Sequence, residues 1–132
     1  MSISTQALAK TVAELTAPGK GILAADESVG TIKKRLKAVN VASTEEFRRD
    51  YRELLFSTPG LGGFISGVIL FEETLKQQSA AGVPLTELLK TQGIVPGIKV
   101  DQGTVLLPNF PGETVTQGLG GLAQRLSEYK QL

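Results

Sequence analysis

The chain has 132 residues, 14 of them lysine or arginine and 13 aspartate or glutamate, and it contains no cysteine and no histidine. This length predicts one domain over residues 1–132. A net charge of +1 argues against a nucleic-acid partner or a polybasic membrane-binding surface. Without cysteine or histidine, thiolate nucleophiles, histidine-based triads and the usual zinc ligands are excluded, so we expect no metal site. Chemistry is left to lysine, arginine, carboxylates and hydroxyls.

The predicted elements alternate along the chain after a leading helix. Three apolar runs predict buried strands, at residues 21–25, 67–71 and 94–101. Apolar residues at helical spacing predict helices at residues 5–16, 32–37, 47–57 and 72–82, and further helices that begin near 84 and 119. This alternation is typical of an α/β fold with a parallel sheet covered by helices, which binds ligands at the C-terminal edge of its strands.

Local signals mark where these elements begin and end. We expect Thr31 to cap the second helix, and Ser43–Glu46 to form a capping box for the third. The third helix is expected to place Phe47, Tyr51, Leu54 and Leu55 on one face. The segment 103–118, which is rich in glycine and proline, is expected to be a connection that leads to the last helix. Residues 1–20 lack a basic stretch followed by an apolar one, so we expect no secretory signal, and no run of 18 apolar residues is present to span a bilayer.

Two charged residues at predicted strand ends are candidates for chemistry. Lys99 lies in the third apolar run, where burial requires an acidic or phosphate partner, and Asp101 could share its face and pair with it. Alternatively, Lys99 extends to solvent. Asp26 follows the first run, where it could act as a general acid or base or orient a catalytic lysine. Aspartate is also common as an ordinary turn cap, so both interpretations stay open.

A possible anion site follows the first strand. Ser28, Thr31, Lys34 and Arg35 combine hydroxyls, a helix start and basic side chains, which together favour phosphate. The same basic residues are equally typical of a solvated helix face, and Arg48 raises the same question. Neither a dinucleotide-binding fingerprint nor a P-loop is present. The pattern alone therefore indicates part of an α/β protein that handles a small anion.

Four separated blocks resemble class I fructose-bisphosphate aldolase in order and spacing. They are Gly19–Ser28 with Lys34–Leu36, Gly67–Phe71 with Glu73–Leu75, Gly97–Asp101 with Gly103, and Gly112–Thr114 with Thr116–Leu119. The resemblance implies a TIM (β/α)₈ barrel that forms a lysine Schiff base and needs no metal or other cofactor. It also implies reversible cleavage of fructose 1,6-bisphosphate to dihydroxyacetone phosphate and glyceraldehyde 3-phosphate, in cytoplasmic glycolysis and gluconeogenesis. The complete protein is then expected to be a homo-oligomer.

The resemblance also implies roles for individual residues. Asp26 corresponds to the family's acid/base aspartate, and Lys99 to a lysine that binds and polarises the substrate. Ser28, Thr31, Lys34 and Arg35 fall where the family binds phosphate, and Arg48 matches a substrate-binding arginine. Gln102 and Gly120 depart from the family pattern, in which lysine and aspartate are usual at these positions.

The chain is shorter than a barrel of this kind, which takes about 250 residues. Only the first three strand-helix units are present, and the Leu-Leu-Lys-Pro context of the Schiff-base lysine is not matched. Lys90 follows two leucines but is expected in a helix. We therefore expect the N-terminal part of an aldolase, inactive alone, and the uncapped ending Tyr129–Leu132 suggests a cut. The alternative is a truncated, non-catalytic product that binds sugar phosphate or docks on another protein through an open sheet edge.

Overall fold

The computed structural model describes residues 4–132. Residues 1–3 belong to the segment 1–20, in which no secretory signal is expected, and they lie outside the described range. The chain divides into two compact units, Met1–Ile98 and Lys99–Leu132.

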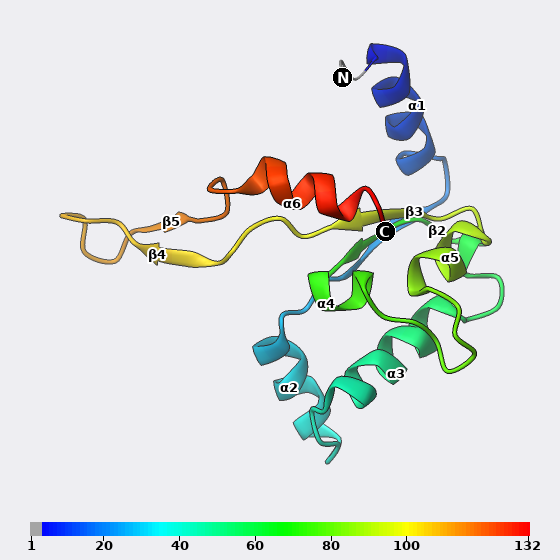
Figure 1. Cartoon of the computed structure of the whole chain (residues 1–132), viewed down its shortest axis with the longest axis horizontal. Coiled ribbons are helices and arrows are strands. Elements are labelled where there is room, and N and C mark those ends of the chain that lie inside the picture. The colour runs from blue at the N-terminus through cyan, green and yellow to red at the C-terminus, as the bar shows by residue number, and fades with distance from the viewer. Residues whose placement is uncertain (1–3) are drawn as a thin grey trace. The chain divides into compact units, whose positions relative to one another are not determined.

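The first unit is built on a parallel sheet (Figure 1). Its strands β1 (Gly21–Ala25), β2 (Ile65–Leu70) and β3 (Val95–Ile98) lie in the order β1-β2-β3. The register pairs Ala25 with Leu70 and Leu70 with Ile98, so the C-terminal ends of the strands are level. The helices of this unit are α1 (Thr5–Leu15), α2 (Val29–Ala38), α3 (Glu45–Phe56), the 3₁₀ turn η1 (Leu61–Gly63), α4 (Glu72–Leu75) and α5 (Leu85–Lys90). The predicted parallel α/β sheet is confirmed.

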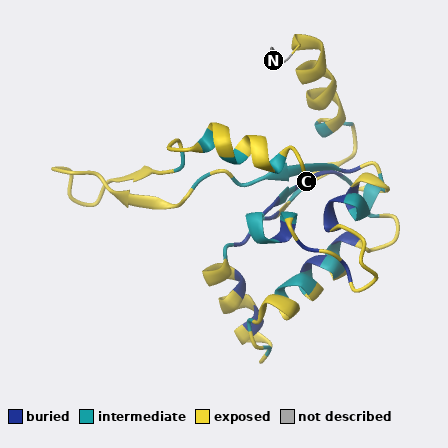
Figure 2. Ribbon diagram, in the orientation of Figure 1, coloured by how far each residue is buried: buried dark blue, intermediate teal, exposed yellow. Residues whose placement is uncertain are grey.

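The core of the first unit lies between one face of the sheet and the helices α3 and α5. Figure 2 shows buried residues along the sheet and along the inner sides of these helices. The core residues are Ala25, Phe56, Val68, Leu70, Leu85, Leu89 and Ile94. Each large apolar side chain buried in this way contributes about 1.5–3 kcal/mol. Successive strand residues point to opposite faces, so Ile22 lies on the other face, where it is 53% exposed.

The end of α1 is held beside the start of β2. The Ser66 hydroxyl donates to the carbonyl oxygen of Leu15 at 2.6 Å and lies 3.2 Å from that of Gly21. A Cβ on Gly67 would come within 2.5 Å of the Leu15 side chain. A larger residue at Gly67 would therefore require the Leu15 side chain to shift.

Two helix starts differ from the sequence prediction. The second helix begins at Val29, with Ser28 rather than Thr31 as its N-cap residue. The third begins at Glu45, where the Thr44 hydroxyl accepts from the Phe47 N–H at 3.2 Å in place of the predicted Ser43–Glu46 box. In both cases a neighbouring hydroxyl residue takes the extended conformation that an N-cap requires.

The predicted apolar face of α3 is only partly buried: Leu55 packs against the core and Tyr51 is half-buried. Phe47 and Leu54 are exposed, and Arg52 and Phe56 are buried. Arg52 can occupy the inner face because its charge is paired there, so the core-facing residues are not all apolar.

The helix predicted over 72–82 ends at Leu75. Beyond it, the Ser79 N–H donates to the carbonyl oxygen of Val83 at 2.8 Å, and the Leu85 N–H donates to that of Gln77 at 3.1 Å. These bonds close a turn at Gly82, whose φ is +78°, and they replace the hydrogen bonds of a continued helix.

The second unit contains a hairpin and a helix. The hairpin strands β4 (Thr104–Leu106) and β5 (Thr114–Thr116) are antiparallel, and α6 (Leu122–Tyr129) follows. The connection 103–118 thus contains a hairpin, and its residues are exposed apart from Gly118, which is half-buried (Figure 2). Arg125 of α6 donates to the carbonyl oxygens of Val100 at 3.0 Å and Gly118 at 2.7 Å, which ties the helix to both ends of the hairpin.

Among residues 4–132, no helix has the length and apolar character needed to cross a membrane.

Candidate functional site

The C-terminal edge of the sheet carries Asp26 and Ser28 of the predicted site residues, together with three glutamates. Asp26, Glu27 and Ser28 follow β1 directly, and Glu72 and Glu73 begin α4 one residue after β2. Since these strands are parallel, their C-terminal ends meet at one edge, which is where open α/β sheets bind ligands. The Asp26 side chain is half-buried, and no described residue donates a hydrogen bond to its carboxylate.

Glu27 binds two arginines. One of its carboxylate oxygens, Oε1, accepts from Arg35 Nη1 at 2.5 Å, and the other, Oε2, lies 2.7 Å from Arg52 Nη1. The second contact is an ion pair without hydrogen-bond geometry. Arg52 also donates through Nη2 to the backbone carbonyl of Glu27 at 3.1 Å, and through Nε to the Thr74 hydroxyl at 3.4 Å. Arg52 thus joins α3 to the segment after β1 and to α4.

Burial distinguishes the two arginines. The Arg52 side chain is 4% exposed and that of Arg35 is 59% exposed. Burial lowers the pKa of Arg52 below its usual range, and the charge of Glu27 opposes that shift. Arg52 is therefore a buried charge paired with Glu27, whereas Arg35 presents part of its guanidinium to solvent.

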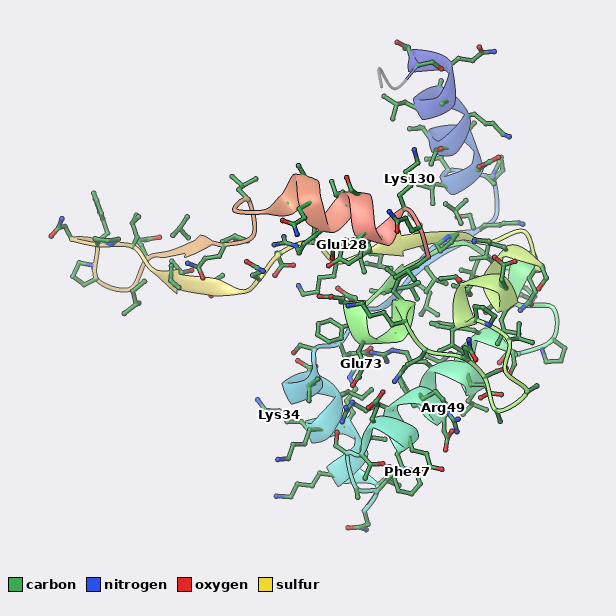
Figure 3. All side chains as sticks on the ribbon, viewed as in Figure 1. Lys34, Phe47, Arg49, Glu73, Glu128 and Lys130 are labelled. Atoms are coloured by element: carbon green, nitrogen blue, oxygen red, sulfur yellow. The ribbon has the colours of Figure 1, made fainter. Side chains whose placement is uncertain are left out.

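The predicted phosphate group is only partly assembled. The Ser28 and Thr31 hydroxyl oxygens lie 3.3 Å apart at the start of α2, close in sequence to the Glu27–Arg35 pair. The start of this helix presents free backbone N–H groups and the positive end of its dipole. Lys34 lies on the exposed side of α2 and points outward in Figure 3. The structure thus brings Ser28 and Thr31 together, pairs Arg35 with Glu27, and leaves Lys34 apart.

Arg48 is bound on three sides. It donates to Glu73 through Nε at 2.8 Å and through Nη2 at 2.5 Å, and to the backbone carbonyl of Ser43 at 2.8 Å. Figure 3 shows Glu73 extending from α4 toward α3. The hydrogen bond to Glu73 raises the pKa of Arg48. In this state Arg48 clamps α3 to α4, and its charge is satisfied by a carboxylate.

Lys99 belongs to the second unit and follows the last residue of β3. The strand predicted over 94–101 ends at Ile98, and beyond it the Asp101 carboxylate accepts a hydrogen bond from the Gly103 N–H at 3.1 Å. Lys99 forms an ion pair with Asp101, as the spacing predicted. The hydrogen bond from Lys99, followed by that from Gly103, holds the pKa of Asp101 below its usual range.

Two residues that hold the candidate site together, Arg52 and Glu73, were not predicted from the sequence. Arg48, Arg52 and Phe56 recur four residues apart, which places them on one helix face. The position of Arg52 on the same helix face as Phe56 was a sequence signal that could have pointed to it.

Lys90 ends α5 and pairs with Glu87 at 2.7 Å, which confirms that this lysine lies in a helix. No group of three or more carboxylates able to hold a metal ion occurs in the described range, 4–132.

A parallel α/β sheet with carboxylates and hydroxyls at its C-terminal edge defines a protein of the ligand-binding α/β class. Residues 7–132 match the family model described as fructose-bisphosphate aldolase class-I. The chain belongs to that family, which confirms the resemblance of the four sequence blocks.

Individual relatives agree with this assignment. The chain is 58% identical over 122 residues to fructose-bisphosphate aldolase 1 of Toxoplasma gondii, an alignment covering 92% of this chain and 34% of the relative. It is 61% identical over 112 residues to the cytosolic fructose-bisphosphate aldolase 6 of Arabidopsis thaliana, covering 85% and 31%. The chain spans about a third of the length of these relatives.

A solved structure shares the fold. A ternary co-crystal structure of fructose-bisphosphate aldolase from Plasmodium falciparum, in complex with TRAP and a small-molecule inhibitor, matches with a TM-score of 0.92 and 56% identity. The match covers 94% of this chain and 36% of that one.

Proposed function

We propose that this chain is the N-terminal part, a single domain over residues 1–132, of a class I fructose-bisphosphate aldolase. The complete protein cleaves fructose 1,6-bisphosphate reversibly to dihydroxyacetone phosphate and glyceraldehyde 3-phosphate in glycolysis and gluconeogenesis. The observation that carries the proposal is the family match over residues 7–132, which includes Asp26 at the end of β1 and Lys99 directly after β3.

The sheet supports an unfinished (β/α)₈ barrel. Within the described residues, β1 and β3 each have one edge without a paired strand. The sheet face that carries Ile22 and Ile69 is less buried than the face against α3 and α5. A barrel pairs both edges with further strands and fills this inner face with side-chain layers. We propose that five more strand-helix units complete it.

The end of β1 supplies acid/base chemistry and a phosphate site in this proposal. Asp26 transfers a proton during cleavage of the carbon–carbon bond, and its carboxylate accepts no hydrogen bond from described residues that would compete. Ser28 and Thr31 bind phosphate oxygens through their hydroxyls, and Arg35 binds through the part of its guanidinium that faces solvent. Lys34, exposed on α2, adds positive charge and reaches the substrate after a side-chain rearrangement.

Lys99 and Arg48 are proposed to contact the substrate by exchanging partners. Lys99, now paired with Asp101, binds and polarises the phosphorylated sugar. Arg48 binds the substrate when a phosphate replaces Glu73, because both anions accept two parallel N–H bonds from a guanidinium. Glu73→Gln is then expected to lower KM, since the amide competes less well for Arg48.

The covalent step is assigned to a lysine outside these 132 residues, since Lys90 lies in α5. No cofactor takes part in the proposed reaction.

The test of the Schiff-base mechanism is borohydride reduction of the purified gene product in the presence of dihydroxyacetone phosphate. We expect irreversible inactivation and a mass gain of one reduced adduct per subunit, with the modified lysine in a peptide outside this chain. A protein that cleaves the substrate without being trapped would contradict the Schiff-base mechanism.

The rival function is a non-catalytic fragment that binds sugar phosphate or docks through the open sheet edges. The intact mass of the natural product, purified from its source cells, separates the two. A mass well above 14.0 kDa supports the aldolase, and a mass near 14.0 kDa supports the fragment.

The remaining parts of the proposal concern partners and location. The sugar phosphate is the partner, with no role for nucleic acid or membrane, as the net charge of +1 favours. The complete protein is proposed to be a cytoplasmic homo-oligomer. The Arabidopsis relative is named cytosolic and a spinach relative cytoplasmic, which supports the location.

A further inference from the structure

We propose that Arg52 is a positioning residue for substrate phosphate: it locks Glu27 in place, and Glu27 in turn aims the exposed guanidinium of Arg35. The inference rests on the proposed function, in which Arg35 binds phosphate. Neither Arg52 nor Glu27 touches the substrate in this arrangement. They form a relay that starts in the protein interior and ends at the sheet edge.

The first step is that Arg52 fixes Glu27. The Arg52 and Glu27 side chains are 4% and 6% exposed, so each charge has little contact with water. A buried charge that loses its partner is strongly unfavourable. Arg52 binds both the Glu27 carboxylate, with 2.7 Å between Nη1 and Oε2, and the Glu27 backbone carbonyl, at 3.1 Å from Nη2. With two points of attachment, Glu27 can neither rotate its carboxylate away nor shift its backbone freely.

Arg52 is itself held from several sides. Its Nε donates to the buried Thr74 hydroxyl of α4, and its guanidinium carbon lies 5.2 Å from the centre of the Tyr51 ring. Its backbone belongs to α3, one turn before the fully buried Phe56. Glu27 is therefore anchored to the core of the first unit rather than to another mobile surface group.

The second step is that the fixed carboxylate holds Arg35. A 59% exposed arginine would ordinarily sample many rotamers, and ordering it upon binding has an entropic cost. Here Arg35 Nη1 donates to Glu27 Oε1 at 2.5 Å, across eight residues. Among described residues, no other group hydrogen-bonds to Arg35, so its remaining N–H groups are available for phosphate oxygens. The guanidinium is thereby ordered before the ligand arrives.

The relay also explains the unequal burial of the three charges. Glu27 balances one arginine, so the group as a whole retains one positive charge, and this charge lies on the exposed member. Ser28 follows Glu27 directly, and its hydroxyl lies 3.3 Å from that of Thr31. Glu27 thus links the hydroxyl groups of Ser28 and Thr31 to Arg35 within one short segment after β1.

The test is a double-mutant cycle on KM for fructose 1,6-bisphosphate, made in the purified full-length protein. Arg35→Met is expected to raise KM about thirtyfold, as loss of charge-assisted hydrogen bonds predicts. Arg52→Met is expected to raise KM about fivefold with kcat within a factor of two, because an ordered side chain becomes mobile. In the Arg35→Met background, Arg52→Met should leave KM unchanged, since no aimed guanidinium remains.

Arg49→Met is the matched control, because Arg49 lies on the same helix and pairs with the adjacent Asp50 away from Glu27. It should leave both kinetic parameters within a factor of two. Should Arg52→Met fail to fold, Glu27→Gln carries the same test, because it keeps the shape of the relay and removes the charge that holds Arg35. Arg52→Lys should raise KM less than Arg52→Met does, because lysine keeps the ion pair with Glu27 but lacks the several N–H donors of a guanidinium.

The outcomes separate this inference from the proposed function. An equal KM increase from Arg52→Met in both backgrounds, or a fall in kcat alone, would mean a general structural role and overturn the relay. Unchanged KM in active Arg35→Met also overturns it and leaves the aldolase assignment intact. A wild-type protein that cleaves no fructose 1,6-bisphosphate overturns the proposed function and the relay with it.

Discussion

The pair formed by Arg48 and Glu73 is expected to be the strongest measurable side-chain coupling between α3 and α4. The perturbation is a double-mutant cycle of Arg48→Met, Glu73→Gln and the double variant. The two N–H donors of Arg48 lie 2.8 and 2.5 Å from the carboxylate oxygens, and the side chains are 14% and 24% exposed. The geometry is bidentate and mostly shielded from water, which is the arrangement in which ion pairs contribute to stability.

The magnitude follows from two opposing effects. Two unit charges about 3 Å apart attract by roughly 5 kcal/mol at an effective dielectric constant of about 20. Desolvation and the ordering of two side chains offset more than half of this gain. We therefore expect a coupling free energy of about 2 kcal/mol, and a cost of about 3 kcal/mol for Arg48→Met alone, which also loses the bond to the Ser43 carbonyl.

The assay is equilibrium unfolding in urea, followed by circular dichroism, of the purified protein and its variants. The control cycle uses Arg49 and Asp50, also on α3, with side chains 27% and 46% exposed. That pair should couple by about 0.5 kcal/mol or less. A coupling for Arg48 and Glu73 no larger than the control value would refute the reasoning that shielding and bidentate geometry make this clamp strong.

Two further predictions test close packing and charge. Gly62→Ala should destabilise the protein by about 3 kcal/mol in the same unfolding assay, because the added Cβ would overlap the backbone carbonyl oxygen of Gln92. Gly63→Ala is the control: nothing lies within 4 Å of its added Cβ, so stability should change by about 0.5 kcal/mol or less. The pKa of the Asp101 carboxyl, measured by ¹³C NMR, should lie below the value of about 3.9 for a free aspartate. The stabilisation from its hydrogen bonds is therefore complete above that pH and is lost as the pH falls through the lowered pKa. Lys99→Met should raise this pKa, and an unchanged pKa would contradict the pairing of Lys99 with Asp101.

The strands were the most predictable part of the fold. Gly21–Ala25 agrees with the predicted run at both ends, and β2 begins two residues earlier than predicted. Continuous apolar runs between helices permit few arrangements, so a parallel sheet follows from their order. The hairpin β4–β5 could not be found in this way. Its strands have three residues each and lie among glycines and prolines, which is too short for a period-two pattern to be recognised.

Helix boundaries and the buried face of α3 were less predictable, and the causes are physical. Adjacent hydroxyls at Ser43 and Thr44 both suit an N-cap, and local sequence does not decide between them. Arg52 occupies a core position only because Glu27, 25 residues earlier, neutralises it there. A local pattern contains no information about such a distant partner, so apolarity alone could not place Arg52 on the buried face.

The structure also bears on the two interpretations of Asp26. As a turn cap it would bind the N–H groups that begin α2, but Ser28 occupies the N-cap position, and Asp26 receives no hydrogen bond from described residues. Its neighbours are fixed, since Ala25 is 1% exposed in the core and Glu27 is held by Arg52. A carboxylate between two immobilised residues, without a structural partner, is ordered at little cost and available to react. These are the properties that the acid/base role proposed for Asp26 requires of a group at a sheet edge.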